Sequence, residues 1–266
     1  MAALLYLFLA HLGVGIVSTL VFVSREAGVK FFRFNAGLAA VLIALAIAFR
    51  PAGGAGVSMN TVALGALVLA EAAIVCYWVT VGRGLAAIRP MLVAIGVGGG
   101  VVALVLQAIT ASAERPVLVQ ALTIASFLSS AALLGGTCTA MVLGHWYLII
   151  PSMQVSHLQA IVKLHIAAMA VRVVVVAGAV FVGLVTSQPG LGVSFRYYIT
   201  SISGVFFWQR VLFGLAGPAV LSYLTWETAR IRSTQSATGI LYIDFFTIVV
   251  GEMLAKYLLL ATRVPV

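Results

Sequence analysis

The chain has 266 residues, of which 63% are hydrophobic and only 8% are charged, and its mean hydropathy is +1.20. Charged residues usually make up about 25% of a soluble domain, so this composition excludes a soluble globule and predicts an integral membrane protein. A net charge of +9 would suggest nucleic-acid binding in a soluble protein, but here the cations flank apolar segments. We interpret them as topology determinants that face the headgroups of the lipid bilayer, and we expect no nucleic-acid partner.

Eight apolar segments are long enough to cross a bilayer, which takes roughly 20 helical residues at about 1.5 Å each. The expected spans are residues 2–23, 34–49, 61–82, 90–110, 117–143, 158–186, 205–226 and 239–261, and the longest loops are 187–204 and 50–60. We therefore predict an all-α integral membrane protein. It is expected to be a polytopic bundle of about eight transmembrane helices, forming one domain over residues 1–266 with no soluble domain.

The Lys and Arg residues near the ends of the spans are distributed unevenly between the two ends of the predicted bundle. One end collects Arg25, Lys30, Arg33, Arg83, Arg89, Lys163, Arg230 and Arg232, whereas the other collects Arg50, Arg115, Arg196 and Arg263. The excess of positive charge favours the first end as cytoplasmic. The sequence therefore predicts a multi-pass protein of the cell (inner) membrane with both termini outside, in the periplasm.

The fifth span and the residues after it are too long for a straight crossing. Residues 117–150 would reach about 50 Å as one helix. The helix is therefore expected to tilt, to kink near Gly135 and Gly136, or to emerge at the cytoplasmic interface with Trp146 and Tyr147. Pro151 is expected to end it, because proline disfavours helical geometry in the residue before it.

Two other spans contain residues that alter helix packing. The fourth span has Gly96 and a run from Gly98 to Gly100, which would let another helix approach closely. In the seventh span, Pro218 predicts a kink, which is tolerated in membranes where neighbouring helices satisfy the freed carbonyl.

Ionisable residues are unusually frequent inside the predicted spans. Each costs roughly 2.5 to 3.5 kcal/mol at the centre of a bilayer, so their number indicates chemistry or transport and not a structural anchor. The residues in question are His11, Glu71, His165, Arg172, Arg210, Asp244, Glu252 and Lys256, with His145 and His157 at the cytoplasmic rim.

Helical periodicity places several of these residues on common faces. At 100° per residue, His157, His165 and Arg172 share one face of the sixth span, while Lys163 points away from it and can reach the headgroups. Asp244, Glu252 and Lys256 likewise share one side of the eighth span. Their polar faces are expected to point into the bundle.

Each ionisable residue has more than one possible role. Proton or charge transfer is assigned to Glu71, Arg172, Asp244 and Glu252, and contacts to haem or quinone to His11, His165, Arg172 and Arg210, with His145 and His157 as rim candidates. Apart from haem iron bound by His11 and His165, no metal site is expected. The structural alternatives are histidines that pack as satisfied polar groups, a self-neutralising Glu252–Lys256 pair, and an Arg172 pair with Glu71 or Glu252.

Two functions compete on these grounds. The first is a membrane subunit of a larger respiratory or redox complex, in which quinone or b-type haem handles electrons and coupled protons. The second is a small permease or ion-coupled transporter, favoured by the charged eighth span and the Pro and Gly interruptions. The short loops and the glycine-rich fourth span further predict other membrane-protein subunits as partners in a hetero-oligomer.

Overall fold

The computed structural model describes residues 1–51, 57–84, 86–150, 153–185 and 195–266, and within these ranges the regular structure is helical throughout. Eight helical segments are long and apolar enough to cross a membrane. The prediction of an all-α polytopic bundle is therefore confirmed. The elements are α1 (Ala2–Leu20), η1 (Arg25–Ala27), α2 (Gly28–Ala48), α3 (Val57–Thr80), η2 (Ala86–Ile88), α4 (Arg89–Ala111), α5 (Val117–Ile149), α6 (Val155–Val185), α7 (Phe195–Thr200), η3 (Ile202–Gly204), α8 (Val205–Val211), the π-helical η4 (Leu212–Ala216), α9 (Gly217–Arg230) and α10 (Thr234–Thr262).

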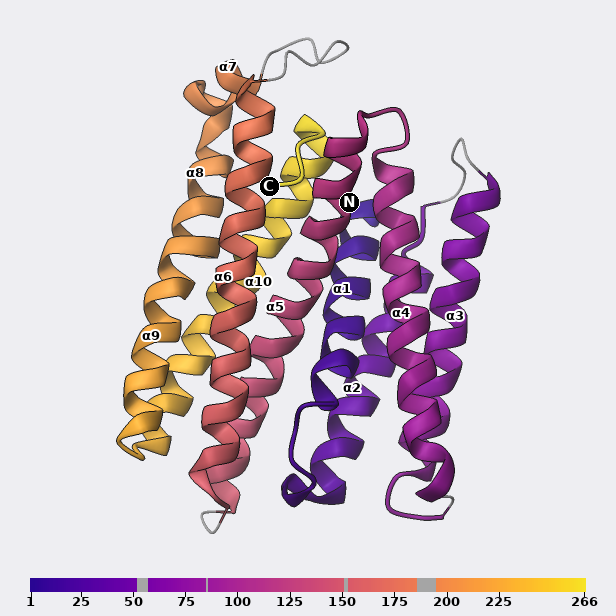
Figure 1. The fold of residues 1–266 in the computed structure, drawn as a ribbon, viewed down its shortest axis with the longest axis vertical. Coiled ribbons are helices and arrows are strands. Elements are labelled where there is room, and N and C mark those ends of the chain that lie inside the picture. The colour runs from indigo at the N-terminus through magenta and orange to yellow at the C-terminus, as the bar shows by residue number, and fades with distance from the viewer. Residues whose placement is uncertain (52–56, 85, 151–152, 186–194) are drawn as a thin grey trace.

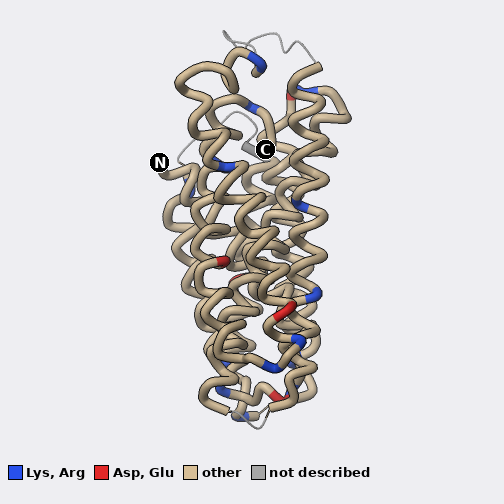
Figure 2. The backbone as a smooth tube through the Cα atoms, turned by 90° about the vertical axis from the view of Figure 1, so that its left-hand side faces the viewer, with Lys and Arg blue, Asp and Glu red and all other residues tan. Residues whose placement is uncertain are grey.

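Successive spans run antiparallel, so both ends of the described chain lie at the same end of the bundle (Figure 1). The connections between α1 and α2, α3 and α4, α5 and α6, and α9 and α10 lie at the opposite end. Charged residues gather toward the two ends, with fewer between them (Figure 2). The sequence predicts such a grouping of the Lys and Arg residues at the two ends of the bundle.

The helices are longer than the predicted spans at several points. The second span was expected to be the shortest, but α2 begins at Gly28 because the basic residues Lys30 and Arg33 continue the helix beyond its apolar part. The predicted 187–204 loop contains α7 and η3. Pro151, which is predicted to end the fifth helix, lies outside the described residues.

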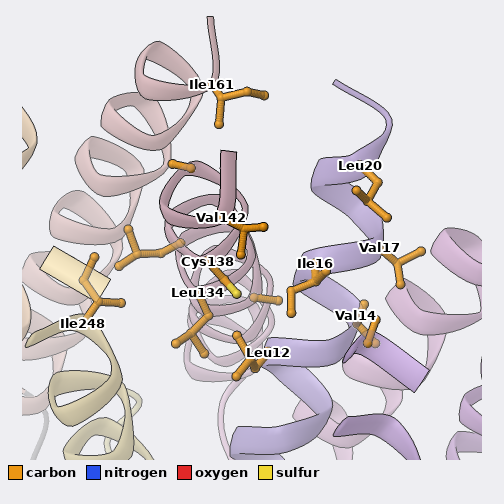
Figure 3. Close-up of a cluster of buried hydrophobic side chains, with 14 of the residues drawn as sticks. Leu12, Val14, Ile16, Val17, Leu20, Leu134, Cys138, Val142, Ile161 and Ile248 are labelled. Carbon is orange, nitrogen blue, oxygen red and sulfur yellow. The ribbon is translucent and has the colours of Figure 1, made fainter. Parts of the chain in front are cut away.

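Helix α5 is the centre of the bundle and packs against α1, α4, α6 and α10. It is assigned as one helix from Val117 to Ile149, and the predicted tilt, kink near Gly135 and Gly136, or emergence at the interface stay predictions. Figure 3 shows apolar side chains of α1, among them Leu12 and Ile16, facing Leu134 and Cys138 of α5. The Thr19 and Thr139 hydroxyls, 2.6 Å apart, join the same two helices.

Glycine sets the close contact between α1 and α5. A Cβ atom built on Gly15 would lie 2.0 Å from the carbonyl oxygen of Ala131, and one on Gly135 would lie 2.0 Å from the carbonyl carbon of Gly15. Neither position can hold a larger residue unless the two backbones separate. The predicted glycines Gly135 and Gly136 thus differ in role, because only Gly135 is at this crossing.

Replacing Gly15 by Ala is expected to destabilise the protein by about 1–3 kcal/mol, because the new methyl group overlaps a backbone carbonyl that cannot rotate away. Gly98 provides the control, since nothing lies within 4 Å of a Cβ placed there. Gly98→Ala should be neutral or stabilising by up to about 1 kcal/mol, as Ala favours helix. Thermal unfolding in detergent compares the two; an equal midpoint for both variants would contradict the close contact.

The glycine-rich part of α4 faces the protein's own helices. Gly96 and Gly99 approach Ile74 and Ala66 of α3, and Gly100 approaches Val14 of α1, while only Gly98 faces open space. The predicted close helix approach is therefore present, but it occurs within this chain. These glycines consequently give little support to the hetero-oligomer, which stays a prediction.

The predicted distortion near Pro218 takes the form of a π-helical turn. η4 occupies Leu212–Ala216, between α8 and α9, so the seventh span is a composite of α8, η4 and α9. Such turns are frequent at functional sites. Here the turn begins two residues after Arg210 and packs against α10, which carries Asp244, Glu252 and Lys256.

Candidate functional site

Glu252 is the centre of a buried cluster of charged residues. Arg172 of α6 donates from Nε and Nη2 to the two Glu252 oxygens, at 2.8 and 3.1 Å. Arg210 of α8 donates from Nη2 to Oε1 at 2.8 Å, and Lys256 Nζ lies 3.6 Å from Oε2. The four residues, from three helices, form what we call the Glu252 cluster. Of the two partners considered for Arg172, the structure selects Glu252 and not Glu71.

The Glu252 cluster holds more positive than negative charge. Three cationic side chains surround a single carboxylate, and all four residues are at most 2% exposed. The predicted Glu252–Lys256 pair exists, yet it is the longest of the three contacts to Glu252. The carboxylate therefore does not simply neutralise Lys256; it is shared among three cations in the membrane interior.

Hydroxyl groups of α5 complete this cluster. Arg172 Nη1 donates to the Ser126 hydroxyl at 2.8 Å and to the Ser126 carbonyl oxygen at 3.0 Å. Ser130 donates to Glu252 Oε2 at 2.6 Å and accepts from Lys256 Nζ at 2.7 Å. Serine is common in the sequence, so nothing but the spatial contact identifies these two as part of the site.

His11 of α1 reaches the same serine. Its Nδ1 lies 3.2 Å from the Ser130 hydroxyl oxygen. Because the Ser130 hydrogen is donated to Glu252, Nδ1 must carry the hydrogen and donate to Ser130, which leaves Nε2 with a bare lone pair. That Nε2 atom is buried and has no hydrogen-bond partner among the described residues.

The backbone brings Arg210 to the cluster through a second glycine contact. A Cβ atom on Gly251 would lie 2.2 Å from the Cα atom of Gly214, so α10 and the π-helical turn touch backbone to backbone. Arg210 Nη1 donates to the Gly214 carbonyl oxygen at 2.8 Å. The glycine pair thus allows Arg210 to lie against α10 beside Glu252.

A second polar site, the His165–Asp244 pair, lies between α6 and α10. His165 Nε2 is 2.8 Å from Asp244 Oδ2, and both side chains are fully buried. Ser222 of α9 is 2.7 Å from the same Nε2, and Thr137 of α5 is 3.0 Å from Nδ1. The contact with His165 has the distance of an ion pair, and neither Asp244 oxygen has a hydrogen-bond partner in the described part of the chain.

Burial favours one proton on the His165–Asp244 pair. The Thr137 hydroxyl donates to the Leu133 carbonyl oxygen at 2.7 Å, so its oxygen accepts from His165 Nδ1–H. The Ser222 hydroxyl can then donate to Nε2 of the neutral ring. An ionised Asp244 would in that case be a fully buried carboxylate without a hydrogen-bond donor among the described residues, which is costly. A proton on the carboxyl group, or on Nε2 beside an ionised carboxylate, makes the pair neutral overall.

The two sites lie at different depths of the bundle. Asp244 and His165 each stand ten residues after the start of their helix, about 15 Å along it, whereas Glu252 is about 27 Å along α10. Helix α5 spans both levels, since Ser130 and Thr137 are separated by about 10 Å. The predicted inward faces of α6 and α10 are confirmed, and together they form two polar sites, one above the other.

The remaining sequence candidates lie elsewhere. Glu71 is on α3, which packs against α2 and α4, and does not join either site. His157, at the beginning of α6, forms a partly exposed pair with Glu26 at 2.7 Å, and His145 is 3.2 Å from the Tyr242 hydroxyl near the end of α5. The predicted orientation of Lys163 is confirmed, as it is exposed beside Trp226.

His11 and His165 do not share one site. His11 contacts Ser130 and His165 contacts Thr137, two helical turns apart on α5. Both nitrogens of His165 already have protein partners, so iron ligation would require one of these contacts to break. Of these two histidines, His11 alone has a ring nitrogen without a partner among the described residues, and the predicted haem or quinone contacts stay predictions.

The fold and the buried charges together define a multi-pass helical membrane protein with two polar sites in its interior. The chain matches no protein-family model, no curated protein and no solved structure.

Proposed function

We propose that the protein is a proton-coupled membrane transporter in which the His165–Asp244 pair holds the transported proton. The observation that carries the proposal is the fully buried Asp244 carboxyl group, 2.8 Å from His165 Nε2 and without a hydrogen-bond donor among the described residues, because this burial favours one proton on the pair. Intramembrane His and Asp residues are expensive to bury and are typical of proton relays. A neutral pair limits that cost while keeping a proton that can be released.

The Glu252 cluster supports the same function. It lies about 12 Å from Asp244 along α10 and contains a carboxylate, a lysine and the hydroxyl of Ser130 in one connected set. The π-helical turn beside it provides a helix segment whose hydrogen bonding is already irregular. These features fit a protein whose charged groups change partners during transport better than a static anchor.

Purified protein in vesicles tests this function. An inward pH gradient drives proton entry, valinomycin with equal potassium on both sides holds the membrane potential at zero, and a pH-sensitive dye inside reports the proton entry. We expect faster acidification than in protein-free vesicles. Equal rates would contradict the proposal.

A membrane subunit of a redox complex is the second candidate. The bare, buried Nε2 of His11 favours it, because this atom could bind haem iron or accept a hydrogen bond from a quinol. In that case purified protein would show haem absorption bands or bind quinone, and native gels would show a complex well above 27.8 kDa. Colourless protein that moves protons alone would favour the transporter.

We also propose that the end bearing the α1–α2, α3–α4 and α9–α10 connections is cytoplasmic, in the inner membrane. With Cys76 and Cys138 replaced by Ala, single cysteines at the exposed positions Arg83 and Arg232 should resist an impermeant thiol reagent in whole cells. A cysteine at Glu114, at the other end, should react. The reverse pattern would invert the topology.

A further inference from the structure

We infer that the Glu252 carboxylate occupies a binding site for a small monovalent carboxylate-like anion, which replaces it between Arg172, Arg210 and Lys256 during transport. This inference rests on the proposed proton-coupled transport and names the class of its substrate. Glu252 would act as a tethered counter-anion that holds the site while no substrate is bound.

The charge of the cluster is the first argument. Two buried arginines and Lys256 share the Glu252 carboxylate, and Arg172 Nη2 also lies 3.5 Å from the Val266 oxygen. The two guanidinium groups alone outnumber the carboxylate, so the site attracts anions even when Glu252 is in place. Unpaired charge is costly in the membrane interior. A second anion would offset that cost, whereas a cation or a neutral solute would not.

The shape of the site is the second argument. Arg172 offers Nε and Nη2 side by side to two oxygens, the bidentate geometry that guanidinium groups use to bind carboxylates. Arg210 approaches the same Oε1 atom, and its own Nε is buried without a hydrogen-bond partner in the described part of the chain. This donor is free for a ligand. These donors are arranged around a single carboxylate group, so the ligand that we infer is a small anion.

Displacement of Glu252 would couple anion binding to protons. The groups that face Glu252 are Arg172 from α6, Arg210 from α8 and Lys256 from α10, together with Ser130 of α5, which connects to His11 of α1. A displaced carboxylate loses the cations and must be neutralised to remain in the membrane, so it takes up a proton. One proton bound per anion makes binding about tenfold tighter for each unit decrease in pH.

Formate binding to the detergent-purified full chain tests this inference. Thermal unfolding is measured at increasing formate concentration and several pH values, with gluconate, which is too large for the site, at equal ionic strength. We expect formate alone to stabilise the protein, with an apparent affinity that rises about tenfold per unit decrease in pH. Absence of formate stabilisation, or equal stabilisation by both anions, would overturn the inference.

Two variants locate the effect. Glu252→Ala leaves an empty carboxylate position, so formate should stabilise it without the wild-type pH dependence. Glu227→Ala, which removes an exposed carboxylate 2.8 Å from Arg230, should retain the wild-type response. If Glu252→Ala does not fold, the pH dependence of formate binding to the wild type still tests the inference, because a formate affinity that does not change with pH would overturn it. Formate binding without proton flux in vesicles would refute the transport function and leave the anion site, whereas flux without formate binding would refute only the site.

Discussion

Glu252→Gln is expected to lower the free energy of unfolding by about 3–5 kcal/mol, the cost of breaking a buried ion pair by removing one partner. The amide has the size of the carboxylate but no charge. Arg172, Arg210 and Lys256 would then be left as buried cations without their shared anion. The sequence alone is also compatible with a Glu252 that titrates and whose neutral form leaves the fold intact. The contacts of Glu252 with Arg172, Arg210 and Lys256 make destabilisation the expected result.

The matched control is Glu227→Gln. Glu227 accepts from Arg230 at the same 2.8 Å distance, but this pair lies at the end of α9 and is exposed. Exposed pairs contribute about 0–1 kcal/mol because water screens them. Thermal or denaturant unfolding in one detergent compares both variants with wild type, and similar small losses for both would show that Glu252 does not hold the cluster together.

Asp244→Asn is expected to reduce proton flux to the rate of protein-free vesicles while the fold is retained. An amide is neither protonated nor deprotonated at neutral pH, so the pair loses the group that receives the proton from His165. Its NH₂ group can still donate to Nε2, which keeps a neutral hydrogen bond in place of the neutral pair. The change in stability should therefore stay within about 1.5 kcal/mol.

Glu26→Gln is the control for this variant. Glu26 and His157 also form a histidine–carboxylate pair, at 2.7 Å, but at the partly exposed end of the bundle. Proton flux through this variant should equal that of wild type. If Glu26→Gln and Asp244→Asn lowered flux equally, the depth of the His165–Asp244 pair would have no part in transport.

The helical class and the inward faces could be predicted from the sequence because each depends on local rules. Apolar length identifies the spans, and the 100° rotation per residue places His165 with Arg172 and Asp244 with Glu252. The same rule placed Lys163 on the outside. These statements need only the position of a residue within its own helix.

The pairing between helices could not be predicted in this way. Arg172 could have paired with Glu71 or Glu252, since rotation alone does not say which helices are neighbours. Nor does an isolated Ser or Thr reveal that it will bridge two charged groups, as Ser130 does. The glycine pair Gly214 and Gly251 offered one overlooked signal, because small residues at matching depths of two spans permit the contact that brings Arg210 to Glu252.

A double-mutant cycle on proton flux tests the central claim most directly. Acidification driven by an inward pH gradient is measured in vesicles that contain wild type, His165→Gln, Asp244→Asn or the double variant, each checked for folding by its unfolding midpoint. If the two side chains share one proton, each single variant should lose as much flux as the double variant, because residues that act as a unit are not additive. Wild-type flux in either single variant, or losses that add in the double variant, would contradict a shared proton at this site.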